Sequence, residues 1–180
     1  MSENLTFSIR KKEIGFLKSK LKLLVVASAK GETIDKQIDQ AFLGQVLKVK
    51  KIENFTGCKK EFLNLYGTTD NVKSEDVSGI NRLVIAGIGK RKLFTGDVIR
   101  SFFADFIRQV NSKKIDSFAI DSDSFGLNIP ENAQACAEGL MLGSYKFNNY
   151  KSNVKKITEV NKIIFLGDAD KKSLDKGRVI

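Results

Sequence analysis

One segment of the sequence could bind phosphate. It consists of Gly87-Ile88-Gly89 followed by the basic run Lys90-Arg91-Lys92. Two glycines after a buried strand are typical of a turn that brings backbone N–H groups close to a phosphate. A dinucleotide-binding turn requires a third glycine three residues later, and Lys92 stands at that position. Two interpretations stay open: a tight strand-to-loop turn, or a phosphate-facing loop helped by the basic run and by a helix starting at Thr95.

Three carboxylates and two thiols offer other chemistry. Asp116, Asp121 and Asp123 are close in sequence, and hard cations prefer clustered oxygen ligands. No EF-hand pattern surrounds them, and Asp- and Ser-rich segments after strands are usually turns, so we expect a turn and keep a metal site as the alternative. Cys58 and Cys136 have no paired spacing and no neighbouring base, which favours ordinary small side chains in a reduced cytoplasm.

The residue types that the chain lacks exclude whole classes of chemistry. Its 180 residues include no His and no Trp. Without imidazole the chain cannot form Ser-His-Asp or Cys-His nucleophile systems or a His-ligated zinc site. Any chemistry that this chain performs alone must use carboxylates, Lys, Tyr or the two thiols.

The net charge of +10 is concentrated in the two ends of the chain. A basic domain attracts nucleic acid or anionic surfaces, but lysines also keep a surface soluble. The aromatic and basic stretch 145–151 could stack on nucleic acid. We favour a helix end whose rings dock on the sheet edge, with lysines at the negative end of the helix dipole.

The elements that must position these residues alternate between strands and helices. Apolar alternation and aliphatic runs predict strands at 5–9, 21–27, 62–66, 82–86, 117–120 and 162–166. Helices are predicted after a Thr33 cap, at 95–110, at 131–145 following Pro130, and from Lys171 onward. The Lys-rich stretch Lys48–Lys51 leads to a turn at 55–58, and 67–79 is interpreted as a loop. This order predicts a single α/β domain with a layered sheet.

Targeting signals are not visible in the sequence. The longest aliphatic run, 23–27, is far below the roughly 18 residues that a membrane span needs. The first four residues lack the basic and apolar pattern of a secretory signal. We therefore expect a cytoplasmic protein without a membrane partner.

Three motifs in order resemble one known family. They are the Phe55-Thr56-Gly57 turn leading to Glu61, the strand from Arg82 through Gly89 to Lys90, and the segment 137–152, whose Ala-Glu-Gly-Leu is followed by Tyr-x-Phe-x-x-Tyr-Lys. On these residues the chain resembles the N-terminal domain of leucyl aminopeptidases, the cytosolic M17 metallopeptidases. The resemblance extends from about residue 20 to residue 180.

The resemblance implies a fold and a domain organisation. The fold would be a three-layer, macro-domain-like mixed β-sheet with helices on both faces. Residues 1–170 would form the N-terminal domain and 171–180 the start of a connector helix. A larger C-terminal catalytic domain, absent from this chain, would hold two divalent metal ions, manganese or zinc. The full-length enzyme would be a homohexamer that releases N-terminal residues, preferably leucine, from peptides.

The resemblance assigns no catalytic, cofactor-binding or metal-binding residue to this chain. Asp175-Lys176-Gly177 is similar to part of the family's metal motif, but Arg178 follows where that motif continues differently. Ala137-Glu138-Gly139 is similar to another motif, with Cys136 in place of its metal-binding Asp. We therefore predict an inactive chain. The alternative from another class is a basic DNA- or nucleotide-binding module.

Overall fold

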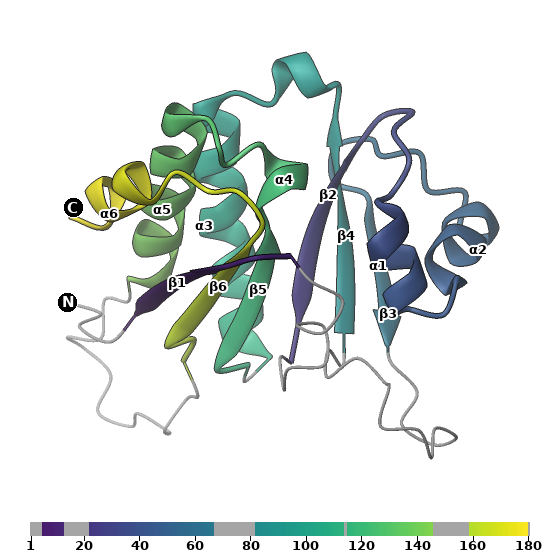
Figure 1. Ribbon diagram of the computed structural model, residues 1–180, viewed down its shortest axis with the longest axis horizontal. Helices are drawn as coiled ribbons and strands as arrows, with labels where there is room; N and C mark the ends of the chain where they lie inside the picture. Colours follow the sequence, from purple (N-terminus) through teal and green to yellow (C-terminus); the bar gives the residue numbers. More distant parts are fainter. Residues whose placement is uncertain (1–4, 13–21, 67–81, 114, 146–158, 180) are drawn as a thin grey trace.

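One six-stranded mixed sheet organises the molecule (Figure 1). The computed structural model describes residues 5–12, 22–66, 82–113, 115–145 and 159–179. The strands are β1 (Thr6–Arg10), β2 (Leu24–Ala29), β3 (Phe62–Tyr66), β4 (Arg82–Gly89), β5 (Ser117–Asp121) and β6 (Lys162–Leu166). Their order is β1-β6-β5-β2-β4-β3. Among these strands only β3 runs antiparallel to its neighbour, β4. The other five strands are parallel, so their carboxyl ends lie at the same edge of the sheet.

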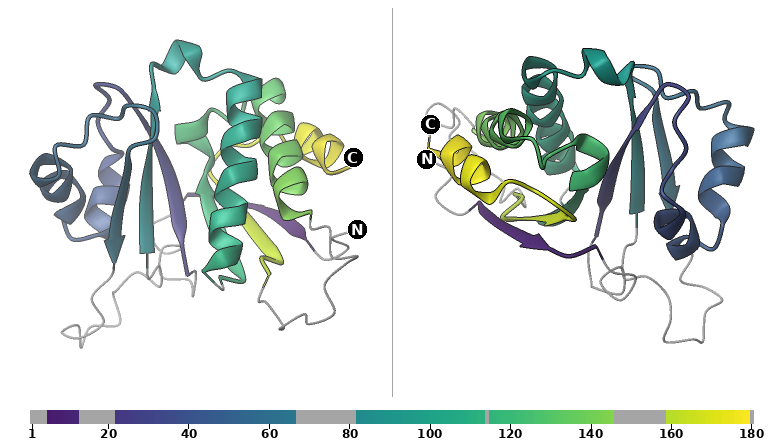
Figure 2. Two further views of the ribbon diagram at one scale, coloured as in Figure 1. Left: turned by 180° about the vertical axis from the view of Figure 1, so that it is seen from behind. Right: turned by 45° about the horizontal axis from the view of Figure 1, so that its top comes forward.

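Helices cover both faces of this sheet. They are α1 (Lys36–Ala41), α2 (Gln45–Ile52), α3 (Gly96–Ser112), α4 (Ser122–Phe125), α5 (Pro130–Ser144) and α6 (Lys171–Arg178), with a 3-10 turn at Arg91–Leu93. Figure 2 shows α3, α5 and α6 on one side of the sheet and α1 and α2 on the other. The expected α/β fold, a mixed sheet with helices on both faces, is confirmed.

Two apolar cores follow from strand alternation. All six residues of β2 are buried, because helices lie over both faces of this strand. Val25 and Ala27 belong to the larger core under α3 and α5, whereas Leu24 and Val26 belong to the core under α1 and α2. Together these cores hold the sheet as the middle layer of a three-layer domain.

The sequence prediction is wrong at four places. Lys48–Lys51, where no helix was predicted, lies inside α2. Helix α1 begins after Asp35, whose side chain accepts from the Gln37 N–H, and not after Thr33. Strand β4 continues through both glycines to Gly89. A single helical turn, α4, follows β5 where we expected only a turn.

The remaining element predictions agree within a few residues. The predicted helix 95–110 is α3, capped at Thr95, and Pro130 occupies the first turn of α5. The predicted strand 162–166 coincides with β6. The predicted loop 67–79 lies outside the described residues. In the described part of the chain, no helix is long and apolar enough to cross a membrane.

Candidate functional site

The strand order indicates where a ligand site should lie. β2 neighbours β4 on one side and β5 on the other, and the chain leaves β2 and β5 toward opposite edges of the sheet. In open α/β sheets, ligands bind beyond the carboxyl ends of the strands at such a reversal. Here the Ala27 N–H donates to Ser124 Oγ at 2.9 Å, which joins β2 to the turn after β5. The candidate site therefore lies at this edge of the sheet.

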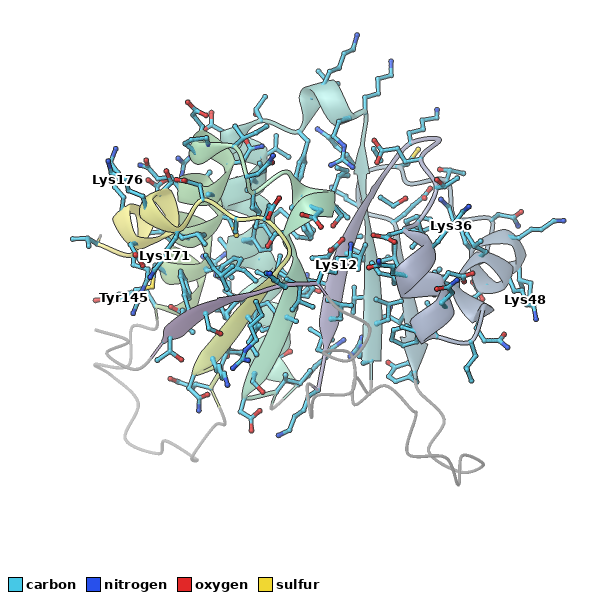
Figure 3. The ribbon with its side chains drawn as sticks, in the orientation of Figure 1. Lys12, Lys36, Lys48, Tyr145, Lys171 and Lys176 are labelled. Carbon is cyan, nitrogen blue, oxygen red and sulfur yellow. The ribbon has the colours of Figure 1, made fainter. Side chains whose placement is uncertain are left out.

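Lys12, which follows β1, forms ion pairs with three aspartates at this edge of the sheet. Lys12 Nζ lies 2.8 Å from Asp121 Oδ1, 2.6 Å from Asp35 Oδ2 and 3.7 Å from Asp123 Oδ2. Figure 3 shows Lys12 beyond the end of β1, facing α1. The cluster ties β1, α1 and β5 together through one ammonium group.

Burial and charge act in opposite directions on this cluster. Asp121 is only 2% exposed, and burial raises its pKa although the Lys12 ammonium opposes the change. Burial lowers the pKa of Lys12, but the carboxylates of Asp121 and Asp35 outweigh it, so the Lys12 pKa is raised. Removing Lys12 would leave the buried Asp121 carboxylate without a counter-charge, whereas Lys12 would keep Asp35 as a partner if Asp121 were removed.

The three aspartates that the sequence offered as a metal site do not come together. Asp116 lies at the start of β5, at the opposite end from Asp121, and pairs with Lys22 at 2.7 Å. Lys12 stands among Asp121, Asp123 and Asp35, where a cation would bind. Within the described residues, no group of three or more Cys, Asp or Glu side chains is placed to hold a metal ion. These residues do not fit a two-metal centre.

A second ion-pair network lies beyond the carboxyl ends of β2 and β4 and is centred on Arg91. Arg91 Nε donates to Glu32 Oε1 at 3.1 Å, and Arg91 Nη1 donates to the Ser124 carbonyl. Lys50 Nζ donates to the Glu32 carbonyl at 2.6 Å. The hydrogen bond from Arg91 lowers the pKa of Glu32. Arg91 thereby joins the segments that follow β2, β4 and β5, while its neighbours Lys90 and Lys92 are exposed.

The two glycines at the carboxyl end of β4 are buried and serve chain packing. A Cβ on Gly87 would lie 2.1 Å from the Cys58 carbonyl oxygen, a distance that no side chain tolerates. Gly89 has φ +73°, and its N–H donates to the Gly57 carbonyl at 2.8 Å. Of the two interpretations that the sequence left open, this geometry favours the tight strand-to-loop turn, with the loop before β3 as the packing partner.

Glu61 organises that loop. One oxygen of its carboxylate accepts from the backbone N–H groups of Thr56, Gly57 and Cys58, at 2.8, 2.9 and 3.2 Å. The other accepts from Thr56 Oγ1 at 2.9 Å. Desolvation raises the pKa of Glu61, but these hydrogen bonds together outweigh it and lower the pKa overall. The Phe-Thr-Gly turn and its glutamate are one structural unit.

The Ala-Glu-Gly-Leu segment fixes the contact between α5 and α3. A Cβ on Gly139 would lie 2.3 Å from the Arg100 carbonyl oxygen. Gly143, one turn later, approaches the Ala104 carbonyl equally closely. Glu138 Oε2 lies 2.6 Å from Arg100 Nη2 across the same interface. The motif residues therefore hold two helices in close contact.

The segment Asp175-Lys176-Gly177 has a similar packing role. It belongs to α6, which begins where the Asp170 side chain accepts from the Ser173 N–H. A Cβ on Gly177 would lie 2.6 Å from the Gln134 carbonyl oxygen of α5. This glycine permits α6 to lie directly on α5.

The remaining candidates show no shared geometry. Cys136 is buried in the core, where burial raises its pKa well above the ordinary value, and Cys58 is half-buried in the loop before β3. Tyr145, at the end of α5, is 54% exposed, and whether the rings of this stretch dock on the sheet edge stays a prediction. The rest of that stretch, 146–151, lies outside the described residues. Figure 3 shows Lys36 and Lys48 at one end of the molecule and Lys171 and Lys176 at the other.

Sequence reasoning missed most of the edge network. Lys12, Glu32 and Asp35 carried no motif signal. Lys12 contacts Asp121 because β1 pairs with β6, and β6 in turn pairs with β5, the strand that ends at Asp121. The spacing of residues along the chain does not predict a contact between residues so far apart in the sequence.

Comparison with known proteins decides the family. The family model described as the cytosol aminopeptidase family, N-terminal domain, matches residues 23–154. The chain belongs to the cytosol aminopeptidase family. The match covers the Glu61 loop, β4 and α5, whose packing contacts are described above.

Curated relatives agree with this assignment. A probable cytosol aminopeptidase of Clostridium perfringens (strain 13 / Type A) is 34% identical over 113 residues, covering 62% of this chain and 22% of that protein. A probable cytosol aminopeptidase of Sulfurihydrogenibium sp. (strain YO3AOP1) is 32% identical over 127 residues, covering 69% of this chain and 24% of that protein. The chain thus spans less than a quarter of the length of these relatives.

Solved structures share the fold of this cytosol aminopeptidase domain. A tomato leucine aminopeptidase mutant aligns with 96% of this chain and 35% of its own, with a TM-score of 0.70 and 17% identity. The bottromycin maturation enzyme BotP in complex with Mn aligns with 87% of this chain and 29% of its own, with a TM-score of 0.58 and 16% identity. At these identities the likeness establishes the fold.

Proposed function

We propose that this chain acts as the non-catalytic N-terminal domain of a leucyl aminopeptidase. The observation that carries the proposal is the family match, which covers 23–154 and is described as the N-terminal domain. The arrangement of the candidate site supports it, because the carboxylates at the carboxyl edge are engaged by Lys12 and Arg91. In this proposal, residues 1–170 are the domain and 171–180 begin the connector to a catalytic domain.

The full-length enzyme would be a two-metal metallo-exopeptidase in the cytoplasm. It would release N-terminal amino acids, preferably leucine, from peptides, and would assemble as a homohexamer. Two metals held by converging carboxylates supply an activated water for such hydrolysis. That donor set is not offered by the described residues. The role of this chain would be to cover the catalytic domain and restrict access to its site.

Two activity measurements test the proposal. The 180-residue chain, assayed with leucine p-nitroanilide and manganese, should give the blank rate. A chimera should be made in which this chain replaces the matching N-terminal segment of the Clostridium perfringens relative. We expect manganese-dependent hydrolysis from the chimera. Turnover by the purified 180-residue chain that follows protein concentration would refute the proposal, as would a chimera that folds without activity.

A further inference from the structure

A small pocket of about 140 Å³ opens on the α3 side of the sheet, at its β3 edge. In the described part of the chain, no helix crosses β3 on this side (Figure 2). Strand alternation places Phe62, Asn64 and Arg82 on this uncovered face, because the leucines between them belong to the core under α1 and α2. The last turns of α3 close the pocket on the other side.

The floor of the pocket is apolar. It is made by four buried side chains, which are Leu23, Val84, Phe106 and Val110. Phe62, 43% exposed, lines the same pocket from the edge strand. A cavity of about 150 Å³ lined by aliphatic and aromatic side chains is large enough to hold benzene. The pocket therefore has room for one ring or one short aliphatic group.

The charged part of the lining is cationic. Arg82 Cζ lies 5.2 Å from the centroid of the Tyr66 ring, so its guanidinium rests on that ring. Lys113, at the end of α3, is exposed and lines the same pocket. None of the described residues that line the pocket is acidic, and neither cation pairs with a carboxylate elsewhere in the described chain. The Asp116 carboxylate, three residues after Lys113, is already paired with Lys22 at 2.7 Å.

Arg82 has donors that the described residues do not satisfy. Its Nη2 donates to Asn64 Oδ1, whereas its Nε is buried without an acceptor among those residues. Buried polar groups nearly always have a partner, so an exception of this kind calls for one. Burial lowers the pKa of Lys113, and the positive charge of Arg82 lowers it further. An anion beside both groups would relieve this repulsion.

We propose that this pocket binds a small organic carboxylate, with the carboxylate at Arg82 and Lys113 and its ring or aliphatic group on the apolar floor. A planar carboxylate matches the N–H fork of a guanidinium. An ammonium group next to that carboxylate would be repelled by both cations, so the site disfavours α-amino acids. The inference goes beyond the proposed function and does not depend on it, because it involves no hydrolysis and no second domain.

The test titrates the 180-residue chain with phenylacetate and follows the NMR shifts of the Asn64, Val84 and Val110 amides. We expect saturable shifts with a Kd of about 1 mM, a value typical of a small ligand on an open site. Phenylacetamide has the same shape without the charge and should bind about tenfold more weakly. Phenylglycine adds an α-ammonium group and should bind about fivefold more weakly. Inorganic phosphate lacks the apolar group and should need about tenfold higher concentrations.

Variants of the two cations separate charge from shape. R82Q should weaken phenylacetate binding about tenfold, and R82K, which keeps the charge but loses the fork, should show a smaller loss. K113Q should weaken binding about threefold, because this lysine is more exposed. Each variant should bind phenylacetamide as the unsubstituted chain does. K51Q, which removes an exposed lysine from the last turn of α2, is the matched control for K113Q and should bind normally. Circular dichroism of each variant establishes that it is folded.

Four results would overturn the inference. The first is an absence of saturable shifts at these amides with phenylacetate well above 1 mM. The second is equal binding of phenylacetate and phenylacetamide, because charge would then play no part. The third is phosphate binding as strong as that of phenylacetate, because the apolar floor would then contribute nothing. The fourth is a folded R82Q variant that binds phenylacetate normally or loses the acid and the amide equally.

Discussion

Replacing Gly139 by Ala should destabilise the domain, because α5 and α3 touch there without a side chain between them. A Cβ would lie 2.3 Å from the Arg100 carbonyl oxygen and 3.0 Å from its carbonyl carbon. Both are backbone atoms of a helix, so neither can rotate away. The helices would have to separate by about 1 Å to restore ordinary contact, which loosens the packing of both faces.

The magnitude follows from two opposing contributions. Alanine is favoured over glycine inside a helix by about 1 kcal/mol. Overpacking of a closely packed interface costs about 1 to 3 kcal/mol, or more where the backbone itself is the obstacle. We expect a net loss of about 2 kcal/mol in the free energy of unfolding. For a domain of this size that corresponds to a melting temperature lower by about 4 to 8 °C.

Urea unfolding followed by far-UV circular dichroism measures the loss, since the chain has no Trp to report on unfolding. Gly96→Ala is the matched control. A Cβ there would lie 3.6 Å from the Ala135 Cβ, an ordinary contact, so stability should stay unchanged or rise by under about 1 kcal/mol. The reasoning would be refuted if G139A were as stable as the unsubstituted chain, or if both glycine variants lost the same amount.

Two further predictions concern the buried and loop carboxylates. Lys12→Met leaves Asp121 buried without a counter-charge and should lower the free energy of unfolding by about 3 kcal/mol at neutral pH. Because the pKa of Asp121 is raised, this carboxylate takes up a proton as the pH falls, and urea unfolding should then show a smaller loss of stability. A loss that does not change with pH would contradict this. The K12M/D121N double variant should recover part of the stability, which a double-mutant cycle would detect as non-additivity. Because the folded pKa of Glu61 is lowered, its stabilising effect is complete above the unfolded pKa of about 4.3 and is lost as the pH falls through the folded value. The protection factors of the Thr56, Gly57 and Cys58 amides, taken against the intrinsic exchange rate at each pH, should fall in that acidic range and, in Glu61→Gln, already at neutral pH. Unchanged protection in the variant would count against the proposed role of the carboxylate.

Local sequence patterns were sufficient for the strongly apolar elements. Strand β6 and helix α3 carry long uninterrupted patterns, and their burial in the structure follows the predicted faces. Helix α2 escaped prediction because only one of its eight residues, Val46, is buried in the core, and three lysines interrupt its apolar pattern. Such a helix is held by its neighbours more than by its own pattern.

Glycine misled the prediction of β4 for a physical reason. Gly87 and Gly89 were interpreted as the end of the strand, since glycine often stops regular structure. In the structure the strand continues, and the glycines are required because the Cys58 carbonyl and the Lys59 side chain approach from the loop before β3. The sequence contains the small residues, but the neighbour that needs them is about 30 positions away.

Residue composition and local patterns were enough to exclude imidazole chemistry and to predict alternating strands and helices and the three family motifs. The roles of the polar residues became evident from the three-dimensional fold. Asp116 and Asp121, five positions apart, separate to opposite ends of one strand, whereas Lys12 and Asp121, more than 100 positions apart, form a buried pair. The reason is that strand pairing, and not spacing along the chain, sets which charges meet at the edge of a sheet.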